Sequence, residues 1–306
     1  MQEFKSNGKI LLTGEYAVLD GAKSLALPTK KGQSLEVSEG KENHISWTSF
    51  DETNKIWFKA DFRIDHGDFQ PILSKEDPET KEIANRLQQI LKAAYKLAPD
   101  ELSKGHSLVT RLDFNRKWGL GTSSTLLNNF SNWLNIDPYK LLKDSFGGSG
   151  YDIAAAGSNH PVTYQLTSHG SKTFTADFDP IFKDELFFVY LNRKQNSREA
   201  IAHYRNQPKE NINGLIEKIS GITEQIIKSE HLMEFKMLLK AHEALISQAI
   251  NLPRIQNELF PDFPGLIKSL GGWGGDFILA TGKEEEKQYF KEKGYHTIFD
   301  YSELIK

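Results

Sequence analysis

The sequence predicts an α+β protein in which a strand-rich part precedes a helix-rich part. Apolar residues recur with period two through much of residues 35–190, as expected for strands with one buried face. Between about 197 and 249 the apolar residues instead follow helical spacing. Three glycine clusters, at 119–121, 147–150 and 271–275, lie at the edges of these elements. Because strands and helices are segregated along the chain, the α+β class is favoured.

The length of 306 residues is enough for two domains of roughly 150 residues each. We place their boundary where the strand pattern gives way to the helical one, which predicts domains at residues 1–182 and 183–306. Apolar residues make up 38% of the chain and charged residues 26%, which is ordinary globular usage and argues against a disordered or fibrous protein.

Charge and cysteine content exclude several classes of function. The chain has 38 Lys and Arg against 41 Asp and Glu, so no global field draws it to nucleic acid or to an anionic membrane. Charged residues interrupt the first twenty positions, and the longest apolar run, Leu186–Leu191, is far shorter than the ~20 residues that cross a bilayer. Cysteine is absent, which fits a reducing compartment. We therefore expect a cytoplasmic protein with neither a nucleic-acid nor a membrane partner.

The strand-rich part begins with a short apolar run at Ile10–Leu12. Alternating apolar positions between Leu35 and Phe62 predict an antiparallel meander. Helical spacing then extends from Glu79 to Leu97, and Pro99 ends that helix. A further strand is predicted at Leu108–Phe114, before the first glycine cluster.

The first glycine cluster leads into a helix that reaches Leu134. Asp137 and Pro138 are an N-cap and a first helical residue, and the helix that they open ends near Phe146. Residues 162–178 predict a hairpin around a His169–Gly170 turn.

A buried strand at Glu185–Leu191 closes the strand-rich part. Long helical patterns follow over about 197–249. After the third glycine cluster we expect a strand at Phe277–Ala280, a charged helix that ends at Gly294, and a last strand near Thr297–Phe299.

The glycine clusters are the strongest indication of function. Glycine lets the backbone approach a ligand closely, and successive free N–H groups form a concavity that binds anions. A single cluster is most often only a turn. Three clusters, the first followed by Thr122, Ser123 and Ser124 at a helix start, favour a ligand that carries phosphate. The chain has neither a P-loop nor a dinucleotide-binding fingerprint, so neither of those sites is supported.

Four segments resemble the ordered motifs of the GHMP kinases, the family of the galacto-, homoserine, mevalonate and phosphomevalonate kinases. They are Ser6–Leu19 (SNGKILLTGEYAVL), Gly119–Ser124 (GLGTSS), Gly148–Ala154 (GSGYDIA) and Lys268–Asp276 (KSLGGWGGD). Any one of these motifs is weak, but the four in this order over nearly the whole chain are specific. The first, third and last look most similar to those of phosphomevalonate kinases.

The resemblance implies a two-domain GHMP kinase fold, with a first domain like the second domain of ribosomal protein S5 and a ferredoxin-like α/β second domain. It implies ATP and Mg²⁺ as cofactors and a small-molecule acceptor, for which we expect phosphomevalonate, in the mevalonate route to isoprenoids. Mevalonate kinase is the alternative, followed by a GHMP kinase acting on a sugar or on homoserine. A catalytically silent GHMP-fold sensor and a diphosphomevalonate decarboxylase stay open, as does assembly into a homodimer.

The resemblance also implies roles for particular residues. Asp152 matches the catalytic aspartate of the family, which orients or deprotonates the acceptor oxygen, and Lys9 matches the lysine of the first motif. Ser123 matches the hydroxyl that binds Mg²⁺, and Asp144 is the only acid on its segment that could be a second ligand. The segment that wraps the ATP phosphates corresponds to Gly119, Leu120, Gly121, Thr122, Ser123 and Ser124.

The expected substrate contacts are Glu15, Tyr16, Ser149, Lys194, Ser197, Gly272 and Gly274. For Tyr16 a buried side chain bonded to backbone is an equal interpretation, and for the segment around Lys194 a solvated loop is at least as well supported. Two departures from the family pattern stand out. Asn115–Trp118 replaces the proline that usually precedes the first glycine cluster, and Trp273 interrupts the third cluster.

Overall fold

The computed structural model describes residues 1–306, which form two compact units. The first unit comprises Met1–Gly8, Lys31–Arg116 and Gly121–Gly157. The second unit comprises Lys9–Lys30, Lys117–Leu120 and Ser158–Lys306. Each unit is therefore built from several chain segments, and a single domain boundary after residue 182 stays a prediction.

The sheet of the first unit has the strand order β5-β4-β3-β6-β2. In β3 and β4 Trp47 lies opposite Ala60 in an antiparallel pair, whereas β3 and β6 are parallel. The other side of β6 pairs antiparallel with the second half of β2, where Leu35 lies opposite Thr110. The strands span Ser24–Glu39 (β2), His44–Phe50 (β3), Ile56–Asp65 (β4), Asp68–Leu73 (β5) and His106–Leu112 (β6).

The predicted antiparallel meander over Leu35–Phe62 is therefore wrong in one respect. Its strands exist, but β6 lies between β2 and β3, so these two strands, adjacent in sequence, are not adjacent in the sheet. Period-two alternation indicates which side chains face the core and says nothing about the neighbouring strand. The parallel β3–β6 pair requires a long crossover connection, and the helices between them supply it.

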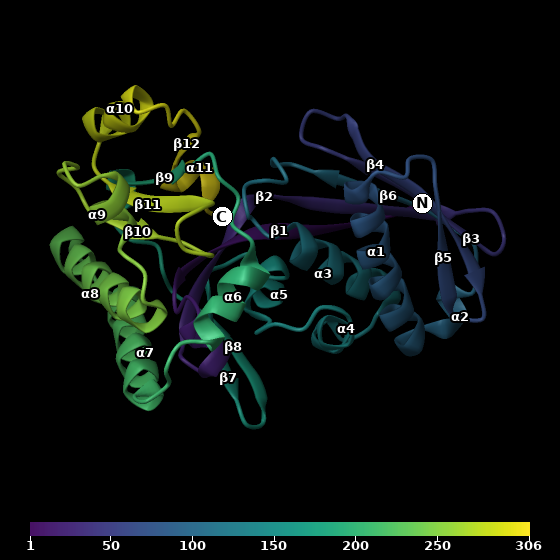
Figure 1. The fold of residues 1–306 in the computed structure, drawn as a ribbon, viewed down its shortest axis with the longest axis horizontal. Helices are drawn as coiled ribbons and strands as arrows, with labels where there is room; N and C mark the ends of the chain where they lie inside the picture. Colours follow the sequence, from purple (N-terminus) through teal and green to yellow (C-terminus); the bar gives the residue numbers. More distant parts are fainter. The chain divides into compact units, whose positions relative to one another are not determined.

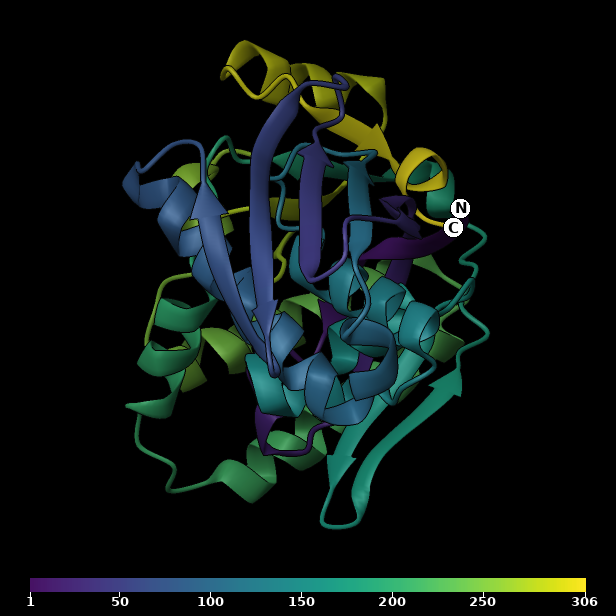
Figure 2. The same ribbon diagram turned by 90° about the vertical axis from the view of Figure 1, so that its right-hand side faces the viewer.

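Helices cover one face of this sheet (Figure 1 and Figure 2). Two predicted helices are confirmed. Asp137 is the N-cap of the second, as predicted, because its carboxylate accepts a hydrogen bond from the Tyr139 main-chain N–H. The first begins after Asp77, which accepts from the Thr80 main-chain N–H and was not predicted as a cap. The core beneath them includes Trp47, which stacks on Phe130 at 5.5 Å between ring centroids. The helices are Pro78–Leu97 (α1), Pro99–Leu102 (α2), Thr122–Leu134 (α3), Pro138–Ser145 (α4) and Tyr151–Ala156 (α5).

The second unit contains an antiparallel sheet of four strands in the order β10-β11-β9-β12. These are Ile267–Ser269 (β10), Phe277–Thr281 (β11), Leu186–Tyr190 (β9) and Ile298–Asp300 (β12). The predicted hairpin is also confirmed, as Val162–Thr167 (β7) and Gly170–Thr175 (β8), and the first half of β2 pairs with β7. The short run expected at Ile10–Leu12 is the end of a 12-residue strand, Gln2–Thr13 (β1).

Helices α7 and α8 pack against each other in the second unit, and both are labelled in Figure 1. A charged helix, α10, lies where the sequence predicts one. No helix of the structure is both long and apolar enough to cross a membrane. The helices are Ser197–Arg205 (α6), Ile212–Lys228 (α7), Leu232–Ile250 (α8), Ile255–Leu259 (α9), Glu284–Glu292 (α10) and Tyr301–Leu304 (α11), with short 3₁₀ turns at Ala17–Asp20 (η1) and Lys183–Glu185 (η2).

Candidate functional site

Lys9, in the part of β1 that belongs to the second unit, is bound to the first glycine cluster. Its ammonium donates a hydrogen bond to the Gly119 carbonyl at 3.0 Å, and its main-chain N–H donates to the Leu120 carbonyl at 2.9 Å. The two motifs are 110 residues apart in sequence. The structure therefore brings together Lys9, Gly119 and Leu120, three residues that the sequence singles out.

Asp276, which ends the third glycine cluster, also reaches Gly119. A Cβ atom at Gly119 would overlap the Asp276 carboxylate, and Gly119 has a φ of +67°, which favours glycine. The carboxylate accepts a hydrogen bond from the Gln195 main-chain N–H at 3.1 Å. Burial raises the pKa of Asp276, while that N–H and the charges of Lys9 and Lys194 oppose the rise. The sequence analysis did not place Asp276 in the site, although the Gly-Gly-Asp ending of the motif was visible.

The third glycine loop has its own main-chain geometry. Gly271, Trp273 and Gly274 all have positive φ, at 62°, 51° and 77°. The Trp273 side chain is buried, and its indole N–H donates to the Pro253 carbonyl at 2.9 Å. Trp273 therefore packs inward, and the glycines on either side of it are half-buried.

The segment after β9 lies against this loop. The Arg193 guanidinium donates a hydrogen bond to the Gly274 carbonyl, and the Asp276 main-chain N–H donates to the Arg193 carbonyl at 2.7 Å. A Cβ atom at Gly272 would crowd the Gln195 side chain. The structure thus places the exposed residues Lys194 and Ser197 on a segment attached to the loop that contains Gly272 and Gly274.

A fully buried ammonium lies a few residues before the same loop. Lys268 on β10 is 0% exposed, and its Nζ lies 2.5 Å from Glu15 Oε1 and 3.4 Å from Glu243 Oε2. Nζ also donates to the Ser269 carbonyl at 2.5 Å. Sequence analysis did not identify this ion pair, because nothing in the sequence links Glu15 to a lysine 253 positions away.

His242 completes the buried cluster. Its Nε2 accepts a hydrogen bond from the Gly14 main-chain N–H at 2.9 Å and lies 3.5 Å from Glu15 Oε2. Burial, and then the Lys268 charge, hold the pKa of His242 well below its usual value, so the ring is neutral. Burial raises the pKa of Glu15 to about 7, although Lys268 opposes the rise, and burial also raises the pKa of Glu243.

The two motif-one residues expected to contact substrate, Glu15 and Tyr16, are both buried. Glu15 is engaged by Lys268, while the Tyr16 ring packs on the Tyr204 ring with centroids 5.4 Å apart. Tyr204 donates to the Asp20 carboxylate at 2.5 Å, and burial raises the pKa of its phenol. Substrate contact by Glu15 and Tyr16 stays a prediction.

In the first unit, α3 begins directly after Gly121, whose φ is +97°. The hydroxyls of Ser124 and Thr125 donate back to the Gly121 carbonyl at 2.9 and 3.0 Å. The Ser123 side chain is exposed, and its hydroxyl does not bond to the Gly121 carbonyl. The start of α3 therefore offers main-chain N–H groups, a partial positive charge and one hydroxyl to an anion or a hydrated cation.

The other predicted residues of the first unit lie on or near its short helices. Asp152 is in the first turn of α5, is half-buried, and accepts a hydrogen bond from the Ile153 main-chain N–H at 3.0 Å. Ser149 precedes α5, and Asp144 is exposed near the end of α4. No group of three or more His, Asp or Glu side chains is placed to hold a metal ion.

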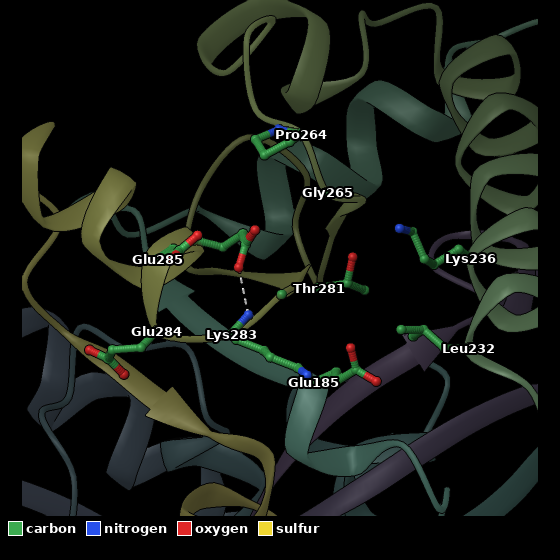
Figure 3. Close-up of a pocket in the computed structure, with 11 residues that line it drawn as sticks. Glu185, Leu232, Lys236, Pro264, Gly265, Thr281, Lys283, Glu284 and Glu285 are labelled. Carbon is green, nitrogen blue, oxygen red and sulfur yellow. Dashed lines mark hydrogen bonds between the residues drawn. The ribbon is translucent and has the colours of Figure 1, made fainter.

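A separate cavity of about 550 Å³ in the second unit contains none of the motif residues. Figure 3 shows its lining, with Lys236 and Leu232 of α8 on one side and the start of α10 on the other. The Glu286 carboxylate there accepts the Lys283 main-chain N–H at 2.7 Å, which caps α10. We assign this cavity no role.

No protein-family model and no curated protein matches the sequence. Solved structures do match. Mevalonate kinase from L. major, in complex with R-mevalonate, aligns with a TM-score of 0.69 and 14% identity over 98% of this chain and 94% of its own. Phosphomevalonate kinase from Streptococcus pneumoniae, in complex with phosphomevalonate and AMPPNP, aligns with a TM-score of 0.66 and 15% identity over 98% and 99%. Galactokinase from Lactococcus lactis, complexed with galactose, gives 0.67 and 14% over 97% and 92%.

These correspondences extend over nearly the full length of each chain, and they show that this protein has the GHMP kinase fold. The predicted α+β class is thereby confirmed, and the structure contains two sheets. The matched structures include kinases of mevalonate, of phosphomevalonate and of galactose at similar identity, so the fold defines a small-molecule kinase architecture without selecting an acceptor.

Replacement of Gly119 by alanine tests the close approach of Asp276. We expect Gly119→Ala to lower the free energy of unfolding by about 2 kcal/mol or more, because it adds both an unfavourable φ and an overlap with the carboxylate. Gly294→Ala is the matched control, since Gly294 has a φ of +88° but no atom within 4 Å of a Cβ. Denaturant unfolding should show a larger loss for Gly119→Ala, and Asp276→Ala should recover the difference. Equal losses in the two variants would contradict the close approach.

The buried carboxyl of Glu15 should make stability depend on pH. A pKa raised from 4.5 to about 7 contributes stability that is complete below pH 4.5 and is lost as the pH rises through 7. The wild type should lose on the order of 3 kcal/mol across this window through Glu15. Glu15→Gln should flatten the profile, whereas Glu258→Gln on the exposed face of α9 should leave it unchanged. Parallel profiles for wild type and Glu15→Gln in chemical denaturation would refute the assignment.

Proposed function

We propose that this protein is an ATP- and Mg²⁺-dependent small-molecule kinase that transfers the γ-phosphoryl group of ATP to phosphomevalonate. The observation that carries the proposal is the full-length fold correspondence with small-molecule kinases, one of which is in complex with phosphomevalonate and AMPPNP. The first, third and last motifs, which look most similar to those of phosphomevalonate kinases, support this choice of acceptor.

The start of α3 supports nucleotide binding. Gly121 is the N-cap of α3. The main-chain N–H groups of Thr122 and Ser123 lie in the first turn, where no earlier helical carbonyl accepts them, so they suit phosphate oxygens. The exposed Ser123 hydroxyl, an oxygen donor, fits Mg²⁺, which binds few protein ligands together with phosphates and water. When bound, Mg²⁺ would neutralise charge on the β- and γ-phosphates. Asp144 remains the proposed second ligand, on its sequence position alone.

The chemistry that we assign to the chain is positioning and electrostatics. Phosphoryl transfer passes through a loose, highly charged transition state, which leaves little covalent work for the protein. Asp152 would orient the acceptor oxygen or take its proton, and Lys9 would neutralise charge on the transferred group. The bond from Lys9 to the Gly119 carbonyl supports this role, because it places the ammonium beside the first glycine cluster.

An anionic acceptor suits the segment around Lys194. Its attachment to the third glycine loop through Arg193 and Gln195 supports the grouping of Lys194, Ser197, Gly272 and Gly274 as substrate contacts. Lys194 is exposed on this segment, and we assign its ammonium to the acceptor. A carboxylate and a phosphate on one small molecule would both benefit from such a cation.

Mevalonate is the second candidate acceptor. Three of the matched structures are mevalonate kinases, with TM-scores of 0.69, 0.67 and 0.64, against 0.66 and 0.57 for two phosphomevalonate kinase structures. The two acceptors differ by one phosphate, so the difference in kcat/KM between them measures how much the protein gains from that phosphate.

An ADP-release assay with four acceptors tests the proposed function. With ATP and Mg²⁺, we expect kcat/KM for phosphomevalonate to exceed that for mevalonate, galactose and homoserine by at least tenfold, because a second anionic group adds charge-assisted contacts. Preference for another acceptor would overturn phosphomevalonate as substrate. Release of CO₂ with phosphate would identify a decarboxylase, and nucleotide binding without turnover of any acceptor would favour the sensor.

Replacement of Asp152 tests its catalytic role. Asp152→Asn keeps the shape of the side chain and removes the charge and the base, so kcat for the preferred acceptor should fall by roughly 10²–10⁴. Asp100→Asn, at an exposed position of α2, is the matched control and should keep wild-type turnover. Full turnover by Asp152→Asn would remove the residue from the mechanism.

A further inference from the structure

The buried cluster of Glu15, His242, Glu243 and Lys268 lies outside the mechanism described above. Every member is 0–2% exposed. Isolated charges are costly in such surroundings, and ion pairs of this kind often add no net stability compared with apolar residues. A buried cluster of this kind is therefore weak evidence for a stabilising role, and its contacts point to another one.

The cluster connects three elements of the second unit. Glu15 lies in the turn between β1 and η1, Glu243 is on α8 and Lys268 is on β10. The Lys268 ammonium makes a hydrogen bond to Glu15 at 2.5 Å and an ion pair with Glu243 at 3.4 Å. It is thus the one group that contacts both carboxylates.

The turn that holds Glu15 depends on this attachment. Gly14 has a φ of +91° and Tyr16 a φ of +60°, so the residues on both sides of Glu15 have positive φ, which is unfavourable for Tyr16. The Gly14 main-chain N–H donates to His242 on α8. Two bonds from the cluster, one to Gly14 and one to Glu15, therefore hold the turn.

The same cluster holds the approach to the third glycine loop. Glu243 accepts hydrogen bonds from both the main-chain N–H and the hydroxyl of Ser269, at 3.1 and 2.7 Å. Ser269 ends β10, and the loop begins two residues later at Gly271. Through Glu243, α8 fixes the start of this loop, just as it fixes the Gly14–Tyr16 turn through His242.

From these contacts we infer that Lys268 is a positioning residue, which holds the Gly14–Tyr16 turn and the Gly271–Gly275 loop at a fixed spacing for the acceptor. The inference rests on the proposed function for its kinetic consequence, since Gly272 and Gly274 are proposed acceptor contacts and Glu15 and Tyr16 are expected ones. It does not rest on the proposed function for its structural consequence, which concerns the mobility of two segments of the second unit.

Amide hydrogen exchange measures that structural consequence directly. In Lys268→Met we expect exchange to accelerate at least tenfold in both the turn and the loop, while the β7–β8 hairpin keeps its wild-type rates. Lys287→Met is the matched control. Lys287 is another lysine of the second unit, lies on α10, and forms an ion pair with Asp300 at 2.5 Å. This variant should change neither segment. Acceleration in only one of the two segments, or in neither, would overturn the inference.

Lys268→Met leaves two buried carboxylates without a cation, which is reason enough for this variant to unfold. The double variant Lys268→Met/Glu15→Gln removes one of these charges, so it separates the two roles of the lysine. A positioning role predicts that the double variant still shows faster exchange in both segments, because the bridge is missing. If Lys268 acts only as a counter-charge, the double variant regains wild-type exchange, and the inference is wrong.

Steady-state kinetics of the double variant measure the functional consequence. We expect KM for the preferred acceptor to rise at least tenfold, with KM for ATP within twofold of wild type. Equal changes in both KM values would contradict a role in positioning the acceptor. If the wild type turns over none of the four acceptors, the proposed function fails while the exchange experiment still decides whether Lys268 positions the two segments.

Discussion

Close packing around Gly119 is the constraint on which the arrangement of the motifs in the second unit depends. Lys9 donates to the carbonyl of this residue, and the Asp276 carboxylate occupies the space where a side chain would begin. Both approaches need a residue without Cβ that tolerates positive φ. Because the Lys9 ammonium and the Asp276 carboxylate meet at one main-chain position, the charge of each influences the other.

Local signals in the sequence predicted many of the helices and strands, but few of the pairings between strands. The cap of α4, the hairpin of β7 and β8, and the charged helix α10 follow from rules that act over a few residues. The insertion of β6 between β2 and β3 does not, since alternation is the same whichever strand is adjacent. Helix α5 also escaped prediction, because its six residues are too few to show periodicity.

For the candidate site, the sequence motifs contain the residues, but they do not show which side chains contact each other. Glu15 and Lys268 both lie in quoted motifs, yet their ion pair joins positions 253 apart. Composition and spacing cannot reveal such a pair, because burial, which makes it significant, is a property of the folded chain. Asp276 is a different case. The sequence shows a carboxylate at the end of a glycine-rich loop, but it does not show that this carboxylate lies beside Gly119.

The buried cluster and the contacts of Gly119 also differ in their physical basis. The close approach of Asp276 to Gly119 requires the absence of a Cβ atom, which is a steric condition. The cluster has two carboxylates and one ammonium around a neutral imidazole, so without a bound proton it has a net charge of −1 in an apolar interior. Burial disfavours that surplus charge, which is the physical reason for the raised pKa of Glu15 and of Glu243. The turn after β1 is thus held by a group of residues whose charge changes near neutral pH.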